Sequence, residues 1–276
     1  ATVYIPSFKE DGSLTFKADV VIDMSSLGAH LNDFAWDYAG NIYGVSHYNK
    51  KIVAYAMPRT ADQVVSTPVA SKYAFTFSDN SSKPTPDQPD AEAKLNPFAY
   101  GLCHEFLNED STQMKLHFRV NALASNVKVV FNDGEKDYIV RDYNGVKAGG
   151  YSTKIDIDTL PRGKQLMWRV DVTGAEVQKI GLVHNAIKVV CPTSIDIDNN
   201  PENANFGTVF FVEVKPDAKD NTAMANYISN MDGAGLYLIN ADGSIRKMPF
   251  QTKNRYGYNG GKVGQSTQYF NGTEVD

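Results

Sequence analysis

The fold is decided by a stretch that occurs twice, first as FAWDYAGNIYGVS at residues 34–46 followed by KIVAYA at 51–56. The second occurrence is split into IDID at 195–198, GTVFFVE at 207–213 and GLYLINA at 235–241. Both copies read as an apolar segment, a turn that contains Asp, a Gly, an apolar strand, a second turn and a further apolar strand. This order is typical of consecutive antiparallel strands in one sheet. A sheet unit that recurs along a chain predicts blades of a β-propeller.

The composition is that of an ordinary globular protein and argues against a nucleic-acid partner. Of the 276 residues, 42% are hydrophobic and 21% are charged, which is the usual range for a packed fold. The net charge is -5, and no basic run is longer than Lys50 and Lys51. Because binding to nucleic acid needs a positive footprint, we expect no nucleic-acid partner.

The sequence predicts no membrane-spanning segment, because it has no apolar run of about 18 residues. The first residues, ATVYIP, lack the basic start and the long apolar stretch of a signal peptide. This predicts either a cytoplasmic protein or a mature or trimmed chain. The two cysteines, Cys103 and Cys191, each lie in an apolar, strand-like context. That context favours two buried thiols over a disulfide bridge.

The first and last parts of the chain have a different sequence pattern from the part between them. Residues 1–77 read as propeller-like strands and begin with a hairpin that turns at Asp11-Gly12. Residues 78–97 begin SDNSSKPTPDQPD, which predicts an exposed, proline-rich linker at a domain boundary. Residues 175–276 return to propeller-like strands without a clean closing strand. The two flanks would supply about four blades, as a small closed ring or, as the unfinished end favours, as a fragment of a larger propeller.

Residues 98–174 alternate between apolar and polar side chains in several short runs. The alternation is clear in KLHFRV at 115–120, in VKVVF at 127–131 and in LMWRVDV at 166–172. Six or seven short strands with turns at this spacing predict a small β-sandwich with Trp168 in its core. No cysteine pair lies across from Trp168, so this is not a disulfide-braced immunoglobulin domain.

One run within this segment carries a family resemblance. The sequence LPRGKQLMWRVDV at 160–172 resembles the closing hairpin of Ig-like domains related to the flagellar hook-capping protein, which end in a Leu-x-x-Gly-x-x-x-x-Trp-x-Val pattern. The order of propeller strands, proline-rich linker, such a module and DNNPE before an NHL-like strand pair is similar to large secreted or surface propeller proteins of Bacteroides-type gut bacteria. The resemblance implies an all-β fold, with propeller-type sheets flanking an Ig-like β-sandwich, and a secreted or cell-surface location.

A cluster of oxygen-bearing side chains raises the question of calcium. Asp196, Asp198, Asn199, Asn200 and Glu202 lie within seven positions. Calcium binds about 6–8 oxygens, which closely spaced carboxylates and amides can supply. The alternative is turn chemistry, in which these side chains bond to nearby backbone. The cluster has no central Gly and no distant Glu at EF-hand spacing, so the turn is favoured. We expect no cofactor, and we keep calcium on Asp196, Asp198, Asn200 and Glu202 as the alternative.

Aromatic residues near the end of the sequence are candidates for a sugar platform. Tyr256 and Tyr258, with Arg255 and Asn259 beside them, lie in a glycine-rich region that would expose their side chains. Tyrosine rings can stack on a sugar ring, while amide and guanidinium groups bond to its hydroxyls. The alternative is ordinary packing between blades. The same alternatives arise in the first copy, where packing is favoured, for Trp36, Tyr38, Tyr43 and Tyr48.

The sequence holds no recognisable catalytic motif. No nucleophile elbow, phosphate loop or metalloprotease helix occurs. The five histidines never pair at a metal or triad spacing, although His30, Asp33 and His47 could meet at a propeller mouth. The favoured interpretation is that these histidines lie in loops and have no catalytic role.

Three functions therefore stay open. The first is a non-catalytic exported or cell-surface binding protein, whose propeller loops hold a glycan or protein ligand with the Ig-like domain as spacer. The second is a propeller hydrolase or lactonase with a divalent cation near Asp37, Asp196 and Asp198, which occupy equivalent places in the two copies. The third is a structural scaffold or adhesin.

Overall fold

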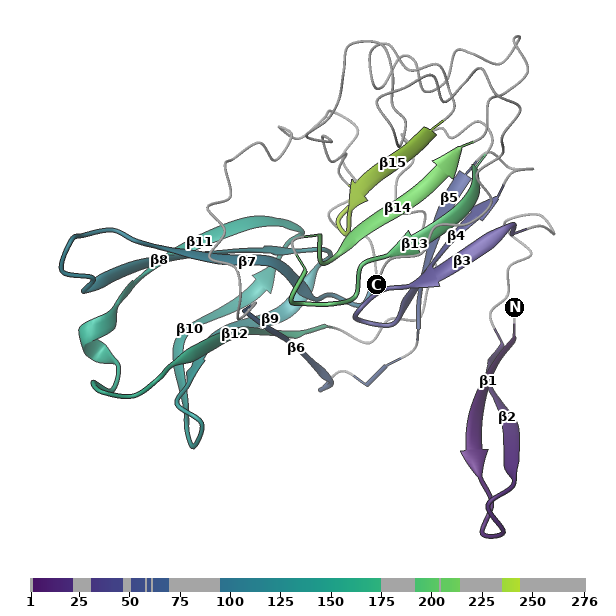
Figure 1. The fold of residues 1–276 in the computed structure, drawn as a ribbon, viewed down its shortest axis with the longest axis horizontal. Coiled ribbons are helices and arrows are strands. Elements are labelled where there is room, and N and C mark those ends of the chain that lie inside the picture. Colours follow the sequence, from purple (N-terminus) through teal and green to yellow (C-terminus); the bar gives the residue numbers. More distant parts are fainter. Residues whose placement is uncertain are drawn as a thin grey trace.

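The described part of the chain is all-β, as the sequence predicts. The structure is a computed structural model that describes residues 2–21, 31–46, 51–57, 59–60, 62–69, 95–174, 192–203, 205–213 and 235–243. Within these ranges it has fifteen strands in five antiparallel sheets and one short 3-10 turn, η2 (Ile157–Thr159) (Figure 1). None of the described ranges forms a helix of the length and apolarity needed to cross a membrane.

The two copies of the repeated stretch each form a three-stranded antiparallel sheet. The first repeat sheet consists of β3 (Asp33–Trp36), β4 (Asn41–Ser46) and β5 (Lys51–Ala56). The second repeat sheet consists of β13 (Pro192–Ile197), β14 (Thr208–Glu213) and β15 (Gly235–Asn240). In both sheets every strand pairs with the next one in the chain, so the copies share their topology.

The copies also match in the turn between their first and second strands. The amide of Asp37 donates to the carbonyl of the first residue of β4 (2.8 Å), and Gly40 donates to the carbonyl of Asp37 (3.0 Å). In the second copy Asp198 donates to the first residue of β14 (3.1 Å), and Gly207 donates to Asp198 (2.9 Å). Both glycines have positive φ, 79° at Gly40 and 77° at Gly207, a conformation that favours glycine. Asp37 is therefore the structural counterpart of Asp198.

The two repeat sheets pack on each other around one core. The strand β13 lies beside β3, where one carboxylate oxygen of Asp33 accepts bonds from Ser194 Oγ (2.8 Å) and from the amide of Ile195 (3.0 Å) (Figure 1). Burial of a large apolar side chain contributes about 1.5–3 kcal/mol, so this core stabilises the pair of sheets. Its members are Ala35, Tyr43, Val45, Ile52, Ala54, Leu95, Ala122, Ile195, Ile197, Val209, Phe211 and Ile239.

The middle of the chain forms a second body, which we call the two-layer unit. One layer has the strand order β10 (Asp137–Val146), β9 (Ala124–Asn132), β12 (Met167–Thr173) and β6 (Val64–Pro68). The other has the order β11 (Gly149–Asp156), β8 (Gln113–Val120) and β7 (Ala99–Phe106). Six strands thus fall between residues 98 and 174, within the predicted six or seven.

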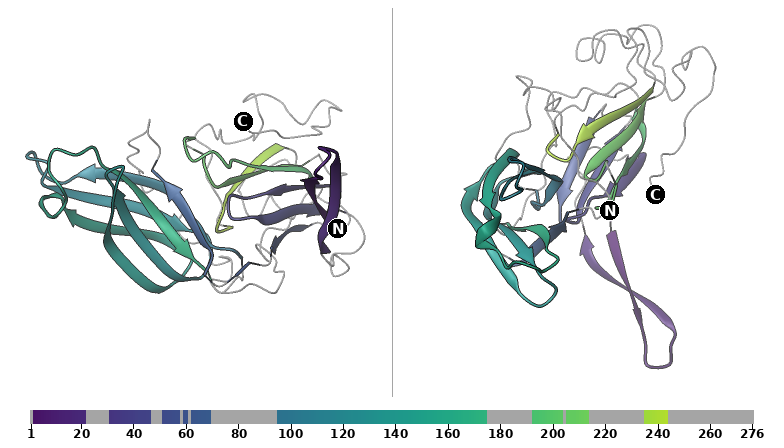
Figure 2. Two further views of the ribbon diagram at one scale, coloured as in Figure 1. Left: turned by 90° about the horizontal axis from the view of Figure 1, so that it is seen from below. Right: turned by 60° about the vertical axis from the view of Figure 1, so that its left-hand side comes forward.

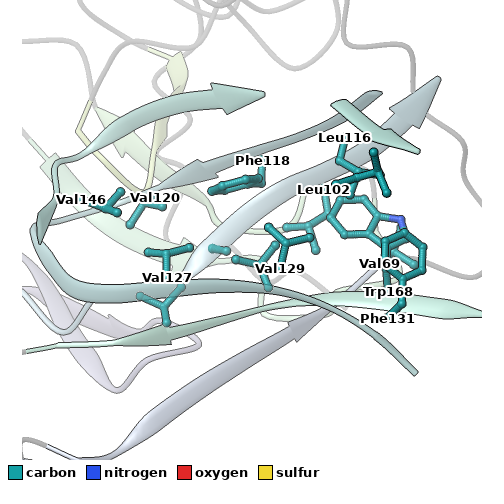
Figure 3. Packing of buried hydrophobic residues seen from close by; sticks show 14 of the residues in the cluster. Val69, Leu102, Leu116, Phe118, Val120, Val127, Val129, Phe131, Val146 and Trp168 are labelled. Atoms are coloured by element: carbon teal, nitrogen blue, oxygen red, sulfur yellow. The ribbon is translucent and has the colours of Figure 1, made fainter. Parts of the chain in front are cut away.

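The alternating residues of both layers meet in a single core, shown in Figure 3. In β8 every second side chain is buried, as the pattern KLHFRV predicts. Trp168 is 3% exposed and lies in this core, which confirms its predicted position. Other members, from both layers, are Leu102, Leu116, Phe118, Val120, Val127, Val129, Phe131, Val146, Val170 and Val172.

The strand β6 belongs to this unit although it lies in the predicted 1–77 segment. It pairs with β12 in antiparallel register, from Val64 opposite Thr173 to Pro68 opposite Arg169. Thr67 Oγ1 also donates to the carbonyl of Ala99 at the start of β7 (2.8 Å). The predicted range 98–174 therefore omits one strand of the unit. Sequence alternation alone could not show this, because it does not say which sheet a strand joins.

The end of the predicted linker is not exposed. Residues 78–94 lie outside the described part, but Leu95 and Asn96 are 4% and 1% exposed, and Pro97 is also buried. Leu95 joins the core of the repeat sheets, and Asn96 bonds to the first repeat sheet. The prediction of an exposed linker is wrong for these three residues, because they fill the junction between the two bodies.

The predicted hairpin at the start of the chain is confirmed. Strands β1 (Thr2–Phe8) and β2 (Leu14–Val21) pair only with each other among the described strands, and they project away from the rest (Figures 1 and 2). At the turn, Asp11 Oδ1 accepts the amide of Ser13 (2.8 Å), and Gly12 has φ 77°. Phe8, Leu14 and Phe16 are 79%, 50% and 60% exposed.

Candidate functional site at the junction

Buried polar and charged side chains gather where the two-layer unit meets the turns of the repeat sheets. It begins at Asp37, which is 5% exposed. One carboxylate oxygen, Oδ1, accepts the amides of Ala39 (3.0 Å) and Asn41 (2.8 Å), which holds the turn in the manner of an Asx turn. The other, Oδ2, accepts Nδ2 of Asn41 (2.7 Å).

Asn41 carries this network across to the two-layer unit. Its Nδ2 donates to the carbonyl of Asn96 (2.9 Å), and its Oδ1 accepts the amide of Asn96 (2.7 Å). Asn121, at the end of β8, also donates to the carbonyl of Asn96 (3.3 Å) and accepts the amide of Phe98 (2.7 Å). Two bodies that are distant in sequence are thus held by reciprocal bonds, each buried and hence costly to leave unmade.

The environment of Asp37 disfavours its charged form. Burial raises the pKa of Asp37 to about 7, and the bonds from Asn41, Ala39 and Tyr43 offset only part of that effect. A carboxyl group that titrates near neutral pH is often found in active sites. Here, however, both oxygens are already occupied by the turn and by Asn41, so the group acts as a structural acceptor.

A second link between the bodies is a buried ion pair. Arg119 of β8 donates from Nη2 to Asp242 Oδ2 (2.6 Å), in the turn after β15, and from Nε to the hydroxyl of Tyr100 (3.1 Å). The side chains of Arg119 and Asp242 are 17% and 7% exposed. Burial lowers the pKa of Arg119, but Tyr100 and Asp242 outweigh it and raise the pKa overall. The guanidinium therefore stays charged and paired.

Aromatic rings fill the space between these two polar links. Phe98 and Tyr100 of the two-layer unit form one cluster with Phe206 and Ala241 of the second repeat sheet and Tyr38 of the first. Phe206 lies edge-on to Tyr38 at 5.0 Å between ring centroids and to Phe98 at 5.9 Å. The junction is thus a packed, apolar contact with a polar network at either side, and the Asp turns of the repeat supply its surface.

The predicted calcium ligands lie in the turn of the second copy and bond to their neighbours. Asp198 Oδ1 accepts the amide of Asn200 (3.0 Å) and Nδ2 of Asn203 (3.3 Å). Asn200 Oδ1 accepts the amide of Glu202 (3.0 Å). Asp196 Oδ1 accepts the next amide (2.8 Å). Of the two interpretations that the sequence leaves open, turn chemistry describes these contacts. Among the described residues no three His, Cys, Asp or Glu side chains form a group that could hold a metal ion.

The three aspartates of the hydrolase hypothesis are not all equivalent. Asp37 and Asp198 correspond, as shown above, but the counterpart of Asp196 is Ala35, because each residue lies two positions before the turn aspartate. The prediction that all three occupy equivalent places is therefore wrong for Asp196. Side chains at Asp37 and Asp198 are committed to their own turns, which explains why the repeat conserves an Asp there.

Other predicted site residues divide between the core and the undescribed ranges. Tyr43 is fully buried in the shared core, Tyr38 lies in the junction, and Trp36 packs partly buried against β4 and β5. Packing, the favoured interpretation, is confirmed for these three. Tyr48, the predicted sugar platform at Arg255, Tyr256, Tyr258 and Asn259, and Cys191 lie outside the described residues. Cys103 is 1% exposed, which confirms its predicted burial.

The described histidines are His104 and His117, and both have partners in the two-layer unit. His104 Nδ1 accepts Nε1 of Trp168 (3.4 Å), and burial lowers the pKa of His104. His117 Nε2 lies 3.3 Å from Glu105 Oε1. His30, His47 and His184 lie outside the described residues. Asp33, the predicted partner of His30 and His47, holds β13 against β3.

Sequence reasoning missed the side chains that carry the junction. Asn96 and Asn121 gave no signal, because their partners lie 55 and 25 positions away in the chain. Asp242 lies 123 positions after its partner Arg119, so local patterns do not indicate that pair either. Comparison of the chain with known protein families, with curated proteins and with solved structures finds no match.

Proposed function

We propose that the chain is a non-catalytic, exported or cell-surface binding protein, in which propeller-type sheets flank an Ig-like sandwich that acts as a rigid spacer. The observation that carries this proposal is the junction. Asn41 and Asn96 exchange buried bonds, Arg119 pairs with Asp242, and a shared aromatic cluster lies between these two links. A spacer must hold its neighbour in a fixed orientation, and this contact is built for that purpose.

The same geometry argues for binding over hydrolysis. Catalysis by a metal or by an aspartate needs oxygens that are open to a substrate or ion. Asp37 and Asp198 instead use their oxygens to hold their own turns, through bonds from Asn41 and Asn200. Loops that leave such a rigid platform are suited to ligand contact, and Tyr256, Tyr258, Arg255 and Asn259 are the residues proposed for a glycan.

A glycan array probed with the full chain tests the binding function. Hits would be measured by calorimetry on the wild type and on Tyr256→Ala and Tyr258→Ala, with Tyr138→Ala of β10 as a matched control. Loss of one stacking ring is expected to weaken binding about 10-fold or more, while the control binds as the wild type. Equal affinity of all four proteins for the glycan would show that Tyr256 and Tyr258 do not form the binding site. A lactone or ester hydrolysis that Asp37→Asn abolishes would favour the hydrolase instead.

The spacer role has a separate test. Spin labels on Asp142 of β10 and Phe34 of β3, both exposed, would report the distance between the two bodies in a Cys191→Ser background. A single narrow distance distribution is expected, and Asn41→Ala should broaden it. A broad distribution in the otherwise wild-type chain would contradict the rigid junction.

A further inference from the structure

The connection between β5 and β6 carries a buried arginine, Arg59, that has no hydrogen-bond partner within the described part of the chain. Arg59 is 8% exposed, and none of the described residues accepts a hydrogen bond from its Nε, Nη1 or Nη2 atoms. A guanidinium offers five donors and stays charged in proteins. An unpaired buried charge of this kind destabilises the folded state, and burial lowers the pKa of Arg59.

The surroundings of Arg59 show how the guanidinium is accommodated. A Cβ atom on Gly174, just after β12, would lie 2.4 Å from Arg59 Nη2 and 2.6 Å from Cδ of Pro97. No side chain fits at position 174 while the guanidinium and the Pro97 ring occupy these positions. Glycine there leaves the guanidinium against bare backbone, in a corner formed by the ends of β5 and β12 and the buried segment at 95–98.

A second unsatisfied atom lies on the residue beside Pro97. Asn96 Oδ1 is buried and accepts from no donor in the ranges that the structure describes, although Nδ2 of the same side chain donates to the carbonyl of Met57 (2.8 Å). Met57 is two residues before Arg59. Among the described residues, Arg59 thus has donors without an acceptor, and Asn96, next to Pro97, has an acceptor without a donor.

We propose that the corner formed by Arg59, Asn96 and Gly174 is a binding site for a small oxyanion. Phosphate, sulfate or a carboxylate group would accept the charge-assisted bonds that Arg59 offers, in the planar geometry that suits a guanidinium. An oxyanion that keeps a proton, such as hydrogen phosphate, would also donate to Asn96 Oδ1. This site is separate from the glycan platform proposed above, so either can fail without the other.

Thermal unfolding of the full chain tests the site. Inorganic phosphate is titrated against chloride at matched ionic strength and pH 7, for the wild type, Arg59→Met and the control Arg162→Met, whose side chain is 81% exposed. Phosphate should raise the melting temperature of the wild type and the control saturably, by about 5 °C at 100 times the Kd. Arg59→Met should show no such rise, and in chloride it should melt no lower than the wild type.

Two results would overturn the site. If phosphate shifts the wild type and Arg59→Met equally, Arg59 does not hold the anion. If phosphate shifts neither and Arg59→Met melts well below the wild type in chloride, the guanidinium is paired within the chain. Should Arg59→Met fail to fold, Arg59→Lys and equilibrium dialysis with labelled phosphate replace it, with binding expected to weaken at least 10-fold. The same titration is repeated with sulfate and with acetate. If sulfate, which carries no proton at pH 7, raises the melting temperature as much as phosphate does, Asn96 Oδ1 does not bind the anion. A rise with acetate would show that a carboxylate group is sufficient for binding.

Discussion

The turn at Asp37 and the turn at Asp198 have the same backbone bonds but different neighbours. In the first copy, Asn41 extends the turn by reciprocal bonds to Asn96, so the aspartate becomes part of a buried network between two bodies. In the second copy, Asn200 and Asn203 bond to Asp198 within the turn, and Asn199 Nδ2 donates to the carbonyl of Trp36 in the first repeat sheet (2.7 Å), not to the two-layer unit. The comparison teaches that a repeat specifies strand register and turn shape, whereas the role of a turn depends on the element that packs against it.

The largest expected difference between the copies concerns their turn glycines. A Cβ at Gly207 would lie 2.9 Å from Tyr100 Cβ, whereas a Cβ at Gly40 would meet nothing within 4 Å. Gly40→Ala should therefore cost only the strain of positive φ, about 1–2 kcal/mol. Gly207→Ala adds a clash with an atom close to the backbone, for a total of about 3–4 kcal/mol. Chemical denaturation measures both, and equal losses would show that Tyr100 does not press on this turn.

The second largest difference in stability between the two turns is expected when their asparagines are replaced. Asn41→Ala leaves the buried amide of Asn96 and one oxygen of Asp37 without a partner, so we expect a loss of about 3 kcal/mol. Asn200→Ala removes a local bond at an exposed position and should cost less than about 1 kcal/mol. Urea unfolding of both variants gives the comparison. A small loss for Asn41→Ala would mean that water replaces the network.

The buried carboxyl of Asp37 predicts a dependence of stability on pH. Its pKa is about 7 in the folded protein and 3.8 as the ordinary value, so the folded state keeps a proton that the unfolded state has lost. The stability from this group is complete below pH 3.8 and is lost as the pH rises through about 7, at up to about 1.4 kcal/mol per pH unit. Asp37→Asn should remove this slope in unfolding experiments between pH 4 and 7. An unchanged slope would assign it to another group.

Calcium should have the smallest effect. Since Asp198 and Asn200 already bond to turn backbone, millimolar calcium should shift the melting temperature by less than about 1 °C. The double variant Asp196→Ala plus Asp198→Ala should respond to calcium in the same way as the wild type. If calcium raises the melting temperature of the wild type saturably and the double variant lacks this rise, the Asp198 turn binds a metal ion. The two turns would then differ in metal binding as well.

Local sequence patterns predicted those structural features that are determined by residues close together in the sequence. The alternation around Trp168 gave its buried position, and the Asp-x-x-Gly spacing around Asp37 and Gly40 gave the turn. The partners of Asn96 and Arg119 could not be predicted in this way, because those bonds span 55 and 123 positions. The same limit applies to β6, whose residues read as a strand without showing that β12 is its partner.

The position of β6 has a consequence for how this chain can be divided. The strand comes before residues 70–94, and every other strand of the two-layer unit comes after them. A protease cut anywhere between 70 and 94 would leave two fragments that each hold part of one sheet. The pairing of β6 with β12, the shared core of the repeat sheets and the bonds between Asn41 and Asn96 would join them. The nicked protein should behave as a split protein whose halves complement one another. For the same reason, a fragment that starts after the linker would lack one of its own strands.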